Sequence, residues 1–197
     1  MIMPIYLYGT NVWEGPTRPI TRFDDKLVGL IHDMFETMHT ADGVGLSATQ
    51  VGLRISLAVM DISEMEGYEN ENPFVAINPE IVESRGERVM EEGCLSVPGI
   101  RSDVLRADTI AVRFTDATFQ PVETELTGIW ARVFQHEYDH LRQKFFVDRL
   151  SGVKRQLLKP KLSKVKRGEV LTRYPAVSAF DEKIKKNREI PEYGFHD

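Results

Sequence analysis

The chain has 197 residues, 42% of them hydrophobic, and a formal net charge of -5. This length is enough for one domain with a hydrophobic core, and the acidic balance excludes the large basic excess that is typical of nucleic-acid-binding proteins. The sequence contains no apolar run of membrane-spanning length and does not begin with a basic segment followed by an apolar one, so a cytoplasmic protein is expected.

Residues 1–23 contain several prolines and turn formers, which predict an extended arm with little regular structure. Asp24 and Asp25 can cap a helix whose apolar residues recur at helical spacing as far as Met38. The helix should stop at Asp42-Gly43, and for Gly43 alone a helix cap followed by a turn is the favoured interpretation.

Small residues dominate the segment from Gly43 to Gln50, where they permit unusual backbone angles and close approach of another chain. The spacing is not that of a dinucleotide-binding loop. Alternating or continuous apolar residues then predict strands at residues 55–60, 74–77, 110–114 and 122–126, with shorter ones at 81–82 and 88–90 around a turn at Gly86.

The only cysteine, Cys94, follows these short strands within Glu92-Gly93-Cys94-Leu95-Ser96. A chain with one cysteine forms no intramolecular disulfide, so Cys94 is a packed thiol, a metal ligand or a nucleophile. Taken alone, this position favours a small buried hydrophobic residue.

The segment His136-Glu137-Tyr138-Asp139-His140 is predicted to be helical, which places the two histidines one turn apart on one face. There they can hold one metal ion, and Glu137 can reach a water molecule on that ion. Two buried, hydrogen-bonded histidines are the alternative. The opposite side of the helix is polar and is expected to face water. It consists of Arg132, Gln135, Asp139, Arg142 and Gln143.

Cys94 can complete the ligand set of His136 and His140 with a thiolate. Three protein ligands leave one position open for water or substrate, which is the arrangement of a catalytic zinc-type site rather than a structural one. The glutamate between the histidines can then serve as the base.

Ser151 is predicted to start a basic C-terminal helix that Pro160 would kink or end. Residues after 168 are polar and interrupted by prolines, so a loosely packed extension without a catalytic role is expected. The predicted organisation is therefore one catalytic domain, residues 1–168, followed by an extension, residues 169–197.

Over about residues 20–150 the sequence resembles the peptide deformylase family, which carries G-x-G-L-A-A-x-Q, E-G-C-L-S and H-E-x-D-H in this order. The joint occurrence is specific, although each motif alone is weak. Ser47 departs from the alanine that is usual in the family. The matching segments are Gly43-Val44-Gly45-Leu46-Ser47-Ala48-Thr49-Gln50, Glu92-Gly93-Cys94-Leu95-Ser96 and His136-Glu137-Tyr138-Asp139-His140.

The resemblance implies an α+β fold, with antiparallel sheets packed around a central helix that bears the histidines and with a C-terminal helix. It implies removal of the formyl group from the N-terminal formyl-methionine of nascent polypeptides at the ribosome, with release of formate. The implied cofactor is one divalent metal ion, usually Fe(II), with Zn, Ni or Co able to replace it. Neither a membrane nor a specific nucleic-acid sequence is an expected partner, and the protein is expected to be a monomer or a homodimer.

The family resemblance also assigns roles to individual residues. Cys94, His136 and His140 would hold the ion, which lowers the pKa of its water to give a hydroxide near neutral pH. Glu137 would be the general acid and base. The remaining expected contacts are the Leu95 N–H and the Gln50 amide to the formyl oxygen, Val44, Gly45 and Gly93 to the peptide, and an ion pair between Glu92 and Arg106.

Two functions from other classes share parts of this pattern. A metalloprotease uses the same H-E-x-x-H chemistry but usually takes its third ligand downstream of the helix, where the first candidate is Glu169. A non-catalytic metal-binding module would fill all four positions with side chains, and the chain has no second cysteine to do so.

Overall fold

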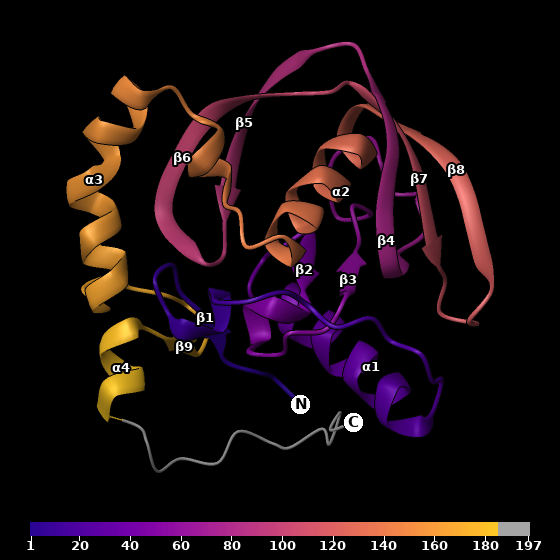
Figure 1. The fold of residues 1–197 in the computed structure, drawn as a ribbon, viewed down its shortest axis with the longest axis horizontal. Helices are drawn as coiled ribbons and strands as arrows, with labels where there is room; N and C mark the ends of the chain where they lie inside the picture. The colour runs from indigo at the N-terminus through magenta and orange to yellow at the C-terminus, as the bar shows by residue number, and fades with distance from the viewer. Residues whose placement is uncertain (185–197) are drawn as a thin grey trace.

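The computed structural model describes residues 1–184 and has an α+β architecture (Figure 1). The helices are α1 (Asp25–Thr40), α2 (Gly128–Leu141), α3 (Gly152–Arg167) and α4 (Ala179–Ile184), with 3-10 turns η1 (Asn11–Trp13), η2 (Ala48–Val51) and η3 (Phe146–Arg149). The strands are β1 (Ile5–Tyr6), β2 (Gly45–Ser47), β3 (Leu57–Met60), β4 (Phe74–Arg85), β5 (Arg88–Cys94), β6 (Val97–Arg106), β7 (Thr109–Thr115), β8 (Pro121–Thr127) and β9 (Ala176–Val177).

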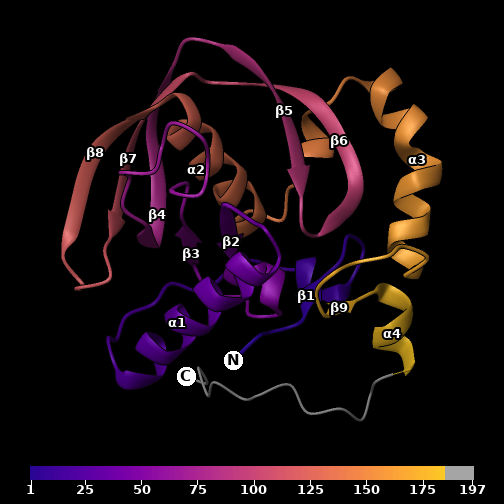
Figure 2. The same ribbon diagram turned by 180° about the vertical axis from the view of Figure 1, so that it is seen from behind.

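A five-stranded antiparallel sheet in the order β2-β3-β4-β7-β8 separates α1 from α2 (Figure 2). Successive side chains of strand β3 point to opposite faces of the sheet. Both faces are covered, so the strand is buried along its whole length. Leu57 and Val59 pack in the cluster that contains the apolar side of α1. Ala58 and Met60 pack in the cluster that contains Phe134 of α2.

Strand β4 is longer than the predicted strand at residues 74–77 and continues through Asn78 and Pro79. Asn78 has a positive φ of 52°, and the pairing with β7 shifts register between Ile77 and Glu80. This irregularity accommodates proline, which cannot donate a ladder hydrogen bond. The chain then turns at Gly86, as predicted, but β4 and β5 enter different sheets.

Strands β5 and β6 form a separate antiparallel pair, and β6 was not predicted from the sequence. This pair contacts the side of α2 that was expected to face water. That expectation is wrong for Arg132, Gln135 and Asp139, which are only 5%, 6% and 3% exposed. They stay buried because each is hydrogen-bonded: Arg132 donates to the Val104 carbonyl, Gln135 to the Ala107 carbonyl, and Asp139 accepts from Arg106.

Residues 1–23 contain little regular structure, as predicted. The two terminal segments nevertheless lie side by side, contrary to the expectation of a loosely packed C-terminal extension. Strand β1 pairs in parallel with β9, and Val177 is buried. Ser151 caps α3 as predicted, but Pro160 lies inside this helix without ending it, on an exposed stretch where carbonyls can meet water. Within residues 1–184 no helix is both long and apolar enough to cross a membrane. Residues 185–197 of the predicted extension lie outside the described part.

Candidate metal centre and active site

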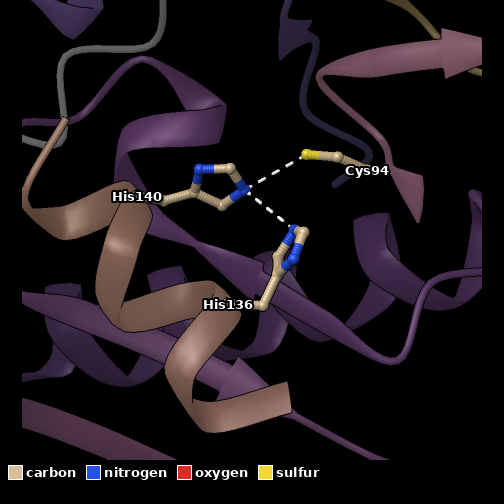
Figure 3. Close-up of side chains that lie close together, drawn as sticks. All are labelled: Cys94, His136 and His140. Atoms are coloured by element: carbon tan, nitrogen blue, oxygen red, sulfur yellow. Dashed lines mark hydrogen bonds between the residues drawn. The ribbon is translucent and has the colours of Figure 1, made fainter. Parts of the chain in front are cut away.

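Helix α2 and the end of β5 bring together the three predicted metal ligands (Figure 3). His140 Nε2 lies 3.1 Å from Cys94 Sγ and 3.2 Å from His136 Nε2. The three ligand atoms all lie within 4.8 Å of one another. A tetrahedral ion bound by sulfur and nitrogen holds its ligand atoms about 3.3–3.6 Å apart. The three side chains therefore form a group that could hold one metal ion.

The second ring nitrogen of each histidine is occupied by a partner outside this group. His136 Nδ1 lies 2.9 Å from Glu92 Oε2, and His140 Nδ1 lies 3.1 Å from the Lys144 carbonyl oxygen. Both partners accept hydrogen bonds, so each Nδ1 carries the proton and each Nε2 is free to ligate. Carboxylate and carbonyl partners of this kind orient the ligands of metal sites. The donor set thus fits a divalent metal.

Glu92 is held by two arginines in addition to His136. Arg106 Nε and Nη2 donate to the two Glu92 oxygens at 2.6 and 2.9 Å, which confirms the predicted ion pair. Arg132 Nη1 donates to Glu92 Oε1 at 2.6 Å. Burial alone would raise the pKa of Glu92, but hydrogen bonds from His136 and Arg106 and the charge of Arg106 hold this pKa well below its ordinary value. Glu92 therefore remains a carboxylate.

Arg106 also donates to Asp139 Oδ2 at 2.6 Å, and Asp139 accepts two further bonds from Arg149 at 2.5 and 2.6 Å. These charges, all buried except that of Arg149, connect β5, β6, α2 and η3 around the histidines. The roles of Arg132, Asp139 and Arg149 were not predicted from the sequence. Helical spacing alone placed the first two on the solvent side, and no local signal identified their partners on distant elements.

Replacing Arg106 with Met should destabilise the protein by about 3–5 kcal/mol, because it removes one charged partner from each of two buried carboxylates, Glu92 and Asp139. The exposed pair Arg113–Glu123 provides the matched control. Arg113→Met should change stability by about 0–1 kcal/mol, as is usual for surface ion pairs. Urea unfolding of both variants measures the two effects. Equal small losses would show that the buried network does not stabilise the fold.

Glu137 lies beside the metal group and is 3% exposed. Within residues 1–184 its Oε2 atom is buried without a hydrogen-bond partner. Burial raises the pKa of Glu137 to about 7, although the charges of His136 and Arg106 act in the opposite direction. A Cβ at Gly45 would lie only 2.6 Å from Glu137 Oε1, so glycine provides the space that this carboxylate occupies.

Gln50 lies in η2 with its amide directed toward Cys94 and Ser96. Its Oε1 accepts from Ser47 N and Ser47 Oγ at 2.9 and 3.1 Å. Its Nε2 lies 3.3 Å from Ser96 Oγ and 3.8 Å from Cys94 Sγ. The Ser47 hydroxyl thus adds a hydrogen bond that orients the Gln50 amide.

The remaining predicted site residues lie on two strands near this group. Gly45 belongs to β2, the terminal strand of the five-stranded sheet, and Val44 directly precedes it. Gly93 belongs to β5, which within residues 1–184 pairs only with β6. Leu95 is half-buried, and a Cβ at Gly43 would meet its side chain at 2.8 Å. The segments of the three motifs, far apart in sequence, therefore meet at one place.

The chain is similar to known proteins over most of its length. The sequence profile of polypeptide deformylase matches residues 2–156. The peptide deformylase of Chlorobium limicola is 44% identical over 177 residues, covering 90% of this chain and 96% of the relative. The crystal structure of a peptide deformylase from Legionella pneumophila superposes with a TM-score of 0.77 at 41% identity, covering 86% of this chain and 98% of that one. The corresponding structure from Thermotoga maritima has a TM-score of 0.71 at 41% identity, covering 77% and 99%. The chain belongs to the polypeptide deformylase family.

Proposed function

We propose that this chain is a metal-dependent hydrolase that removes the formyl group from N-terminal formyl-methionine and releases formate. The observation that carries this proposal is the convergence of Cys94 Sγ with two histidine Nε2 atoms, next to a buried carboxylate oxygen of Glu137 that lacks a partner within residues 1–184. Helix α2, which bears three of these four residues, is proposed to be the central helix of the catalytic unit.

Cys94, His136 and His140 would hold one divalent ion, with Fe(II) as the cellular metal and Zn, Ni or Co as substitutes, because thiolate and imidazole suit several transition metals. When bound, such an ion acts as a Lewis acid toward a carbonyl oxygen and lowers the pKa of water.

Glu137 is proposed to move the proton. Its free Oε2 accepts a proton from the attacking water and then donates it to the nitrogen of the leaving amine. Burial raises the pKa of this carboxyl above its ordinary value, which favours a group that both accepts and returns a proton near neutral pH. The side chain needs no rearrangement between the two steps, since water and amine nitrogen would lie on the same reacting carbon.

Gln50 and Leu95 are proposed to stabilise the negative charge that develops on the formyl oxygen. Ser47 donates to Gln50 Oε1 and so directs the Nε2 of Gln50 toward the metal group. One Nε2 hydrogen is given to Ser96 Oγ, and the other would be given to the formyl oxygen. The Leu95 backbone N–H would be the second donor. Fixed donors of this kind are typically worth about 3–4 kcal/mol each in the transition state.

The peptide is proposed to bind as an added strand at Val44, Gly45 and Gly93. Terminal strand β2 and the end of β5 both lie beside the metal group and carry residues with small or no side chains. Backbone pairing recognises an extended peptide without regard to most of its sequence, which suits an enzyme acting on many nascent chains. We place this reaction in the cytoplasm, at the ribosome, by a monomer or homodimer without sequence-specific binding of nucleic acid.

Release of formate from a formyl-methionyl peptide by the iron- or zinc-loaded protein tests this function. A deformylase releases formate and leaves the peptide chain intact. Cleavage of internal peptide bonds in the same sample would indicate a metalloprotease. Stoichiometric metal binding with no product of either kind would indicate a non-catalytic module.

A further inference from the structure

Tyr174 follows α3 and lies beyond residues 2–156, the segment matched by the deformylase profile. It contacts Leu95, the residue that follows Cys94. Its hydroxyl donates to the Leu95 carbonyl oxygen at 2.6 Å. Tyr174 and Leu95 both pack against the buried cluster that contains the apolar side of α1. A residue of the C-terminal segment thus holds the backbone of a residue that the proposed function places at the formyl oxygen.

Leu95 and Ser96 form the two-residue turn between β5 and β6, since Cys94 pairs with Val97. Both carbonyls of this turn are held by terminal segments of the chain. Tyr174 donates to the Leu95 carbonyl, and the Tyr8 backbone N–H donates to the Ser96 carbonyl at 2.8 Å. Because peptide units are planar, fixing these two oxygens restricts the rotations of the turn, including those that direct the Leu95 N–H.

The segment that carries Tyr174 is itself fixed. The Pro175 carbonyl accepts from Ile5 N at 2.8 Å, and the adjacent strand β9 pairs with β1. Thr172 Oγ1 donates to the Tyr174 carbonyl at 2.8 Å. Burial, followed by the charge of Cys94, raises the pKa of the Tyr174 phenol well above its ordinary value, so the hydroxyl stays protonated and remains a donor.

We infer that Tyr174 is a positioning residue for the oxyanion donor at Leu95, and that the segment after α3 completes the active site. This inference deepens the proposed function and depends on its assignment of the Leu95 N–H. The hydrogen bond of the Tyr174 hydroxyl goes to the Leu95 carbonyl, not to a metal ligand. It acts by holding the turn in the orientation in which the Leu95 N–H points to the formyl oxygen.

The test is Tyr174→Phe, which retains the ring and removes only the hydroxyl. Complete loss of an oxyanion donor costs about 100- to 1000-fold in kcat, so a donor that is present but less well directed should cost about 10-fold. The substrate's other contacts persist, and KM should therefore change by less than about twofold. Metal content and melting temperature should match those of the parent protein.

Thr172→Val is the matched control, since it removes a hydrogen bond within the same segment without touching Leu95. Its kcat should stay within about twofold of the parent value, in contrast to Tyr174→Phe. A second readout is the Leu95 amide signal in ¹H–¹⁵N NMR spectra of the zinc-loaded protein labelled with ¹⁵N-leucine. This amide signal should shift in Tyr174→Phe and stay in place in Thr172→Val.

Unchanged kcat and an unmoved Leu95 signal in Tyr174→Phe would overturn the inference. Equal losses of kcat and melting temperature in both variants would also overturn it, because they would show a general role in packing the segment. If the parent protein itself releases no formate, the proposed function fails instead, and the Leu95 signal alone then decides whether Tyr174 directs this amide.

Discussion

Glu137→Gln should lower kcat for formate release by about 100- to 10,000-fold, the usual range for a positioned acid–base group. The amide keeps the shape of the side chain but cannot accept a proton. Metal binding should persist, because Cys94, His136 and His140 form the ligand group and Glu137 does not belong to it. Metal content and formate release are therefore measured on the same purified sample.

Glu125→Gln is a control with the same chemical change on an exposed strand, β8, and should leave turnover unchanged. Glu137→Asp should be slow as well, because the shorter side chain falls out of hydrogen-bond reach of the water. If Glu137→Gln loses metal in proportion to activity, the carboxylate is a ligand or a structural group. If it keeps both, another residue is the base.

Cys94→Ser should remove most of the bound metal and most of the activity. Changes in the partners that surround ligands typically cost about 10- to 100-fold in metal affinity, and the loss of a thiolate ligand itself should exceed this range. A serine hydroxyl stays protonated near neutral pH and is a poor replacement for the thiolate. Metal titration of the variant, with formate release at saturating metal, measures both losses.

Ser96→Ala provides the comparison for Cys94→Ser, since it alters a small polar side chain in the adjacent turn. Ser96 is buried and accepts from Gln50 but does not belong to the ligand group. This variant should bind metal as the parent protein does, whatever its effect on turnover. Full metal occupancy of Cys94→Ser with parental affinity would refute the assignment of Cys94 as a ligand.

Local patterns were sufficient to predict the parts of this protein that depend on neighbouring residues. The period of the helix places His136 and His140 on one face, and α1 begins at its Asp24 cap as the sequence predicts. Alternating apolar residues correctly located β7 and β8. Motif order, rather than any single motif, then identified Cys94 as the third member of the group.

Other features were decided by contacts between segments that lie far apart in the chain. The side of α2 that carries Arg132 and Asp139 is polar by composition, yet β5, β6 and η3 supply partners that bury it. Burial of charges is favourable only when such partners are present, and helical periodicity carries no information about them.

The C-terminal segment shows the same limit. Its polar, proline-containing sequence indicates a loose extension, but pairing of β9 with β1 brings Tyr174 to the Leu95 carbonyl. Strand pairing satisfies backbone groups irrespective of side chain, so these short strands leave little trace in composition. The sequence by itself determined which residues could carry the chemistry, whereas the tertiary structure decided which buried charges and which terminal segment hold them in place.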